Sequence, residues 1–197
     1  MSYAFHHPAV QEAVQHGEVG AIAVTLFEWS SVAVQHQSIA WTRLSDGESF
    51  DTFADLIGET ARSVPGGSTA IGDALSFAGN LFEKSGFRSP RHVIDVSGDG
   101  SNNSGPAPDA IRDRLVDQGI TINGLAILSD EPNLHEYYGA AVIGGEGAFV
   151  LTAENYQSFA NAIINKLVKE IAGNDKAREP SLRVQLAEYG DRDLPYE

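Results

Sequence analysis

Two short loops carry the small polar residues that could do chemistry in this sequence. The first, Gly66-Gly67-Ser68-Thr69, precedes an apolar stretch with helical spacing, and the second, Gly98-Asp99-Gly100-Ser101, follows the apolar run Val93–Val96. Hydroxyl and carboxylate oxygens are hard ligands of the kind that Mg²⁺, Ca²⁺ or Mn²⁺ prefers. In open α/β sheets, ligands bind at the carboxyl ends of strands. Asp99 therefore stands where a binding site is expected.

Both residues also have an ordinary structural explanation. Thr69 is a good N-cap for the helix expected after it, and Asp99 can stabilise a turn through its own backbone. Other kinds of site fit less well. An EF-hand loop beginning at Asp95 would place Pro106 where a bidentate Glu is needed, no P-loop lysine follows the Gly-Gly-Ser-Thr loop, and no Gly-x-Ser-x-Gly nucleophile elbow occurs. The residues do not predict an enzyme.

The elements around these loops predict an α/β fold. A continuous apolar run at residues 21–27 predicts a strand buried on both faces. The mixed segment 32–41 predicts an edge strand, the second arm of a hairpin. Later strands, around 93–96, 120–127 and 148–151, alternate with helical patterns, which is typical of βαβ crossovers. We therefore expect a Rossmann-like, doubly wound, mainly parallel sheet with one antiparallel edge strand.

The length and composition of the chain limit the number of domains and the kinds of partner that it can have. A chain of 197 residues is expected to form one domain, predicted here over 1–172, and the charged residues 173–197 are expected to be a poorly packed tail. The formal net charge of −14 disfavours nucleic acid and anionic membrane surfaces as partners. No apolar stretch is long enough for a membrane span, no signal peptide is visible, and the absence of cysteine excludes thiolate chemistry.

Several segments resemble the von Willebrand factor type A (VWA) domain. Thr69–Leu75 resembles that fold's metal-site threonine segment, and Val93–Asn103 resembles the strand that delivers its metal-site aspartate, here Asp99. The likeness spans about Tyr3–Gly173 and is closest to a bacterial group of uncharacterised proteins within that superfamily. The phrases shared with that group lie at 22–29, 93–103, 120–125, 142–145 and 147–150.

The resemblance implies a metal-ion-dependent adhesion site. In that fold Mg²⁺ is held by an Asp-x-Ser-x-Ser loop after the first strand, together with the threonine and the second aspartate, which correspond to Thr69 and Asp99. An open coordination position accepts an acidic side chain from a partner protein. The resemblance also implies export to the periplasm or beyond, and it implies no oligomeric state.

The sequence departs from this pattern in two linked respects. It contains no Asp-x-Ser-x-Ser, and the first, central strand is expected to be missing between the strands at 21–27 and 93–96. One explanation is a misassigned start or a cut chain. The other is that the two flanking strands pair directly in a smaller sheet without a competent metal site. Either way, we predict a poorly stable chain that binds Mg²⁺ weakly.

Three functions follow as hypotheses. The first is a non-catalytic, metal-dependent protein-binding module. The second is a structural or interaction domain whose degenerate site binds no metal. The third is a nucleotide-binding enzyme of Rossmann-like architecture, which would need a phosphate-binding glycine loop after the first strand.

Overall fold

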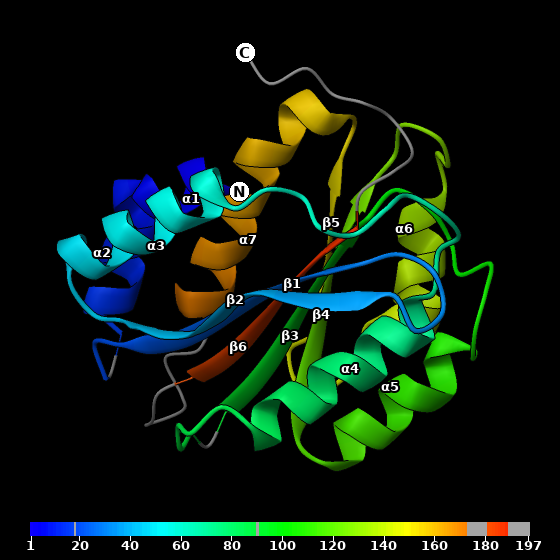
Figure 1. The fold of residues 1–197 in the computed structure, drawn as a ribbon, viewed down its shortest axis with the longest axis horizontal. Coiled ribbons are helices and arrows are strands. Elements are labelled where there is room, and N and C mark those ends of the chain that lie inside the picture. Colours follow the sequence, from blue (N-terminus) through cyan, green and yellow to red (C-terminus); the bar gives the residue numbers. More distant parts are fainter. Residues whose placement is uncertain (18, 90, 173–180, 189–197) are drawn as a thin grey trace.

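The fold is built on a single six-stranded sheet, seen in a computed structural model that describes residues 1–17, 19–89, 91–172 and 181–188. The order of the strands across the sheet is β2-β1-β6-β3-β4-β5 (Figure 1). Their bounds are β1 Ile22–Trp29, β2 Gln35–Leu44, β3 Arg91–Gly98, β4 Ile120–Ile127, β5 Val150–Ala153 and β6 Ser181–Glu188.

Only the β2–β1 pair is antiparallel among these six strands; the other four neighbouring pairs are parallel. All residues of β1 and β4 are buried, as the continuous apolar runs predict. In β2, at the sheet edge, only two of the ten residues are buried, five are half-buried and three are exposed, as is usual for a strand with one solvated face. The predicted mainly parallel α/β sheet with one antiparallel edge strand is confirmed.

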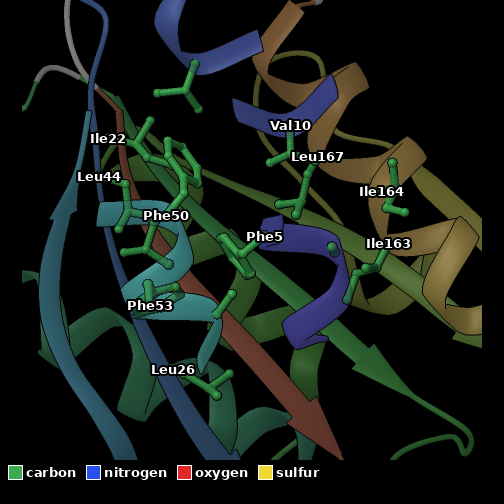
Figure 2. Packing of buried hydrophobic residues seen from close by; sticks show 14 of the residues in the cluster. Phe5, Val10, Ile22, Leu26, Leu44, Phe50, Phe53, Ile163, Ile164 and Leu167 are labelled. Carbon is green, nitrogen blue, oxygen red and sulfur yellow. The ribbon is translucent and has the colours of Figure 1, made fainter. Parts of the chain in front are cut away.

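Helices cover both faces of the sheet and enclose two separate cores (Figure 1). One face carries α1 (Ser2–His6), α2 (Pro8–Gln15), α3 (Gly47–Glu59) and α7 (Tyr156–Ala172), whose apolar side chains meet those of β1 and β2 in the cluster drawn in Figure 2. The other face carries α4 (Ile71–Glu83), α5 (Pro108–Asp117), α6 (Leu134–Tyr137) and the π-helical turn η1 (Tyr138–Val142). No helix in the described ranges is both long and apolar enough to cross a membrane.

The centre of the sheet corrects two sequence-based expectations. We expected the strands at 21–27 and 93–96 either to lack a central neighbour or to pair directly, and we expected 173–197 to be a poorly packed tail. Instead, Ser181–Glu188 forms β6, which lies between β1 and β3 and runs parallel to both. Its alternating sequence, Ser-Leu-Arg-Val-Gln-Leu-Ala-Glu, has the period of a strand. The rest of that tail, 173–180 and 189–197, lies outside the described residues.

A buried ion pair joins the sheet to α7. The Lys166 Nζ lies 2.6 Å from the Asp95 Oδ1, and both side chains are almost completely buried, with exposed fractions of 0% and 1%. Asp95 stands in the middle of β3, beside Asn123 of β4 in register. Because a buried charge without a partner is costly, this pair fixes α7 against β3.

Candidate functional site

Thr69 lies just before α4 and does not cap it. The N-cap of α4 is Ala70, and no side chain of that residue caps the helix. The amide of Gly72 in the first turn instead donates to the Asn102 Oδ1, over 3.3 Å. The interpretation of Thr69 as an N-cap is therefore wrong, because Asn102 reaches the helix from the next loop. The Thr69 side chain, 8% exposed, needs another explanation.

The backbone of Thr69 is fixed by the loop that follows Asp99. The Thr69 N–H donates to the Asn103 Oδ1 at 2.8 Å, and the Thr69 carbonyl accepts from the amides of Asn103 and Ser104 at 2.9 and 3.2 Å. These bonds tie the two loops that the sequence singled out to each other. The structure thus brings the two chemical loops together at one edge of the sheet.

Asp99 follows β3 directly and is half-buried. Its neighbour Gly100 lies against the Thr69 side chain: a Cβ at Gly100 would stand 3.4 Å from the Thr69 Oγ1 and 3.7 Å from the Glu131 Oε1. Gly100 therefore separates a hydroxyl from a carboxylate that approach it from two other loops. The predicted residues Thr69 and Asp99 belong to one small region, and Glu131 joins them.

Glu131 holds the turn that carries Asp99. Its Oε1 accepts from the Ser101 amide at 3.0 Å and from the Ser101 hydroxyl at 3.1 Å. Next to this contact, the Asn102 amide donates to the Tyr137 hydroxyl at 3.3 Å. The segment between β4 and α6, together with α6, thus supplies two acceptors to the turn that follows β3.

The electrostatic environment of this edge is negative. Burial raises the pKa of the Tyr137 phenol; the hydrogen bond from the Asn102 backbone opposes this, while the charges of Asp109 and Glu131 raise the pKa further. The phenol is therefore held neutral and accepts the Asn102 hydrogen bond. A site with this surplus of negative charge suits a cation better than an anion.

Two serines that directly follow β1, Ser30 and Ser31, contact the loop that carries Thr69. The Ser30 carbonyl accepts from the Ala70 amide at 2.9 Å, and the buried Ser30 Oγ, beside it, has no hydrogen-bond partner among the described residues. The Ser31 hydroxyl accepts from the Ser68 amide at 3.1 Å, and the hydroxyls of Ser68 and Ser104 are 2.9 Å apart. A buried oxygen without a partner is uncommon in proteins. The Ser30 hydroxyl is therefore a further candidate metal ligand beside the Thr69 loop.

A buried carboxylate anchors the loop that leads to Thr69. Glu28, 4% exposed in β1, accepts from both the amide and the hydroxyl of Ser63, at 2.9 and 2.6 Å. Because the loop is held at Ser63 and again at Thr69, its position is set from both ends. This makes the edge a preorganised surface rather than a set of independent loops.

The oxygen atoms at this edge are of the type that a hard divalent cation binds, but they are too few to complete its coordination shell. The hydroxyls of Thr69 and Ser30 and the carboxylates of Asp99 and Glu131 are the oxygen types that Mg²⁺ takes, usually with several waters retained. Within the described ranges, however, no three His, Cys, Asp or Glu side chains are grouped closely enough to hold a metal. Any ion here would depend on hydroxyls and water for most of its ligands.

Sequence reasoning missed the residues that assemble the edge. Glu28, Glu131 and Ser30 act through contacts with residues 30 to 40 positions away, and no local pattern reveals such partners. Asn102 and Asn103 lie in the segment Val93–Asn103 that resembles the VWA fold, but no pattern in the sequence assigned them a role of their own. Their side chains bind α4 and Thr69, and a pair of amides after a strand is the one signal that could have suggested this.

We expect Glu131→Ala to loosen the Asp99 turn. The variant loses two hydrogen bonds to a carboxylate, which should lower the free energy of unfolding by about 1–2 kcal/mol and speed hydrogen exchange at the Ser101 amide at least about tenfold. Glu131→Gln, which keeps an acceptor oxygen, should retain much of the protection. Glu136→Ala, at an exposed position of α6, is the matched control. Unchanged exchange at Ser101 in Glu131→Ala would contradict this role.

The fold is similar to two solved structures. Proximal thread matrix protein 1 from the mussel byssus aligns with 87% of this chain at 17% identity, with a TM-score of 0.56. A von Willebrand factor type A protein from Catenulispora acidiphila aligns with 86% of this chain at 19% identity, with a TM-score of 0.51. The alignments cover 42% and 37% of those two chains, so this chain spans about two fifths of their length.

At such low identity, these likenesses concern the fold alone, and they show that the chain has a VWA-like fold. No curated protein gives a significant match. A family model does match, over residues 1–175, and it includes both Thr69 and Asp99. The chain therefore belongs to the family described as "Protein of unknown function (DUF1194)".

Proposed function

We propose that this chain is a non-catalytic protein-interaction domain that binds its partner at the edge formed by Thr69, Asp99 and Glu131. A divalent cation, Mg²⁺ by preference, would be held there weakly and would accept an acidic side chain of the partner. The observation that carries the proposal is the position of Thr69: its hydroxyl does not cap α4 and lies beside Gly100, next to Asp99.

Three further observations support the proposal. The VWA-like fold is one that suggests protein interaction rather than a particular reaction. The edge is preorganised by bonds from Asn103, Glu28 and Glu131, so binding a partner would cost little ordering. The chain carries a formal net charge of −14, and a bound cation offsets repulsion between this surface and an acidic partner.

The chain's own residues would do two things at this edge. Thr69 and Asp99 would hold the ion, with the Ser30 hydroxyl as a further donor, and Glu131 would keep the Asp99 turn in place through Ser101. The ion supplies a Lewis-acidic position for a carboxylate. Mg²⁺ retains waters readily and exchanges one for a carboxylate, which suits reversible recognition.

A second candidate is an interaction domain whose edge works without metal. It is favoured by the lack, among the residues that the structure places, of three grouped His, Cys, Asp or Glu side chains. In that case the acidic rim of Asp99, Asp109 and Glu131 would meet a basic partner surface directly. The two candidates differ in whether Mg²⁺ changes the protein.

Thr69→Ala separates the two candidates. With a dissociation constant of about 1 mM, 10 mM Mg²⁺ would stabilise the native protein by about 1.4 kcal/mol, a rise in melting temperature of roughly 3–6 °C for a domain of this size. Thr69→Ala and Asp99→Asn should lose this Mg²⁺-dependent rise, while Thr69→Ser keeps a hydroxyl and should retain it. Differential scanning fluorimetry with and without Mg²⁺ measures the effect.

One control variant tests whether the result is specific to this site. Asp117→Asn removes one exposed negative charge at the end of α5, away from the Thr69 loop in sequence, and should leave the Mg²⁺ response intact. The same Mg²⁺ response in wild type, Thr69→Ala and Asp99→Asn would mean that the ion acts on general surface charge. No response in wild type would favour the metal-free interaction domain.

A further inference from the structure

The connection between α4 and β3 differs in charge from the rest of this acidic chain. From Lys84 to Ile94 the sequence contains three Lys or Arg residues and no Asp or Glu, whereas acidic residues outnumber basic ones by 27 to 13 overall. We call the described residues of this connection, 84–89, the basic loop. It leads into the start of β3, and Asp99 follows the end of that strand. The basic loop and the Thr69 edge therefore lie at opposite ends of the sheet (Figure 1).

The basic loop exposes two cations and an aromatic ring. Lys84 and Arg88 are exposed, and Phe87 is 37% exposed, which makes it one of the few large apolar side chains at the surface of the described residues. None of the ion pairs within the described ranges involves Lys84 or Arg88. Lys84 is the C-cap of α4, where the helix dipole favours a cation. Arg88 lies beyond the helix, so this explanation does not apply to it.

Two serine hydroxyls hold the backbone of this connection in place. The Ser85 hydroxyl accepts from the Phe87 amide at 3.2 Å and donates to the Phe87 carbonyl at 3.3 Å. The Ser89 hydroxyl makes the same pair of bonds with Arg91, at 3.2 and 3.0 Å. Because these bonds are already made in the free protein, a partner of the loop would pay little for ordering its backbone.

Aromatic contacts fix the end of α4 from which the basic loop starts. The ring of Phe82, in the last turn of α4, lies 5.8 Å from that of Trp41 in β2 and 4.8 Å from that of His92 in β3, measured between centroids. The Trp41 Nε1 also donates to the Leu81 carbonyl at 3.1 Å. The exposed side chains of the loop are thus presented from a part of the helix that is bound to two strands.

We propose that the basic loop is a second interaction surface, which binds an acidic, extended segment of a partner protein through Lys84 and Arg88 and packs an apolar side chain of that segment against Phe87. Aromatic residues and arginine are enriched in protein interfaces. This binding goes beyond the function proposed above, because it involves another part of the surface and needs no divalent cation.

The charge of the whole chain favours a short acidic segment over an anionic membrane. With a formal net charge of −14, the protein repels a large anionic surface. A short segment touches only the basic loop and is steered there, because like charges disfavour its approach to the acidic parts of the surface. Lys84 and Arg88 therefore set both the sign of the partner and the place where it binds.

The test is an NMR titration of the full chain with a short glutamate-rich peptide that has one central phenylalanine. EDTA is present throughout, so that no divalent cation at the Thr69 edge contributes to binding. We expect shifts of backbone amides concentrated in 84–89 and 91–92, with an affinity that falls as salt is added. The same peptide with a central serine should bind several-fold more weakly, and one with lysine in place of glutamate should not bind.

Surface variants identify the residues that bind the peptide. Arg88→Glu and Lys84→Glu should each weaken binding at least about fivefold, and Phe87→Ser should abolish the preference for the phenylalanine peptide over the serine peptide. Lys169→Glu changes the net charge equally on α7, across the sheet from α4, and should bind as wild type does. Unchanged affinity in Arg88→Glu, shifts centred outside the basic loop, or no shifts in wild type would overturn the proposal.

Vesicles of phosphatidylcholine and phosphatidylserine test the alternative partner. We expect the protein not to sediment with them, because the acidic surface as a whole is repelled. Sedimentation with these vesicles that is lost in Arg88→Glu would assign the loop to a lipid surface and overturn its assignment to a protein segment.

Discussion

Val184→Pro is expected to destabilise the whole domain strongly. Proline has no N–H for the strand ladder and is confined in natural sheets to edges, strand starts and bulges. At the centre of β6 it leaves a buried acceptor of β1 or β3 unpaired, and we expect a loss of about 3 kcal/mol or more in the free energy of unfolding. Domains of this kind are stable by only about 5–15 kcal/mol in total.

Urea unfolding followed by circular dichroism measures this loss. Ser181→Pro is the matched control, because a proline is tolerated at the first residue of a strand, and it should change the midpoint little. If Val184→Pro unfolds at the same urea concentration as wild type, the sheet does not depend on β6, and the original expectation of a poorly packed tail would be restored for 181–188.

Breaking the buried ion pair is expected to have an effect of similar size. Lys166→Met leaves the Asp95 carboxylate buried at 1% exposure with its cation gone. Removing one partner of a buried pair typically costs about 3–5 kcal/mol, mainly because the remaining charge is left uncompensated. Thermal and urea unfolding should both register the change.

The double variant Lys166→Met/Asp95→Leu separates this cause from simple loss of packing. Replacing both charges with apolar side chains of similar volume is often neutral or even stabilising, so the double variant should recover most of the lost stability. Lys169→Met, an exposed lysine of α7 that lies 4.3 Å over the Phe149 ring, should cost less than about 1 kcal/mol. A double variant as unstable as Lys166→Met would show that the pair is not the cause.

Local patterns were sufficient to predict most of the fold. The apolar runs of β1 and β4, and the apolar stripe of α4 with Ile71 and Leu75, are properties of neighbouring residues that burial then selects. The antiparallel edge strand followed from the mixed polarity of the segment after β1. Each of these predictions rests on periodicity within one element, and the structure confirms them.

The centre of the sheet could not be predicted in the same way. Residues 181–188 alternate apolar and polar side chains, but they lie in a highly charged stretch, and the charge of the surroundings outweighed the short period. Nothing in the sequence around Lys166 indicates that it is buried, because a lysine on a helix is usually solvated. Only its contact with Asp95, 71 positions earlier, explains why it is buried.

The candidate site, like the fold, could be predicted from the sequence only in part. Residue type and strand position were enough to select Thr69 and Asp99, and the structure places their loops together. The N-cap role of Thr69 was predicted wrongly because Asn102, from another loop, binds the start of α4. Whether Thr69 and Asp99 bind a metal stays a prediction.

The most direct test of the interaction site is Mn²⁺ titration of the full chain, followed by NMR of its backbone amides. Mn²⁺ takes the same oxygen ligands as Mg²⁺ and broadens the signals of nearby amides. We expect broadening to begin selectively in residues 66–70 and 99–103, to be displaced by excess Mg²⁺, and to disappear in Thr69→Ala. Broadening spread over the acidic surface, or unchanged in Thr69→Ala, would contradict a cation site at this edge.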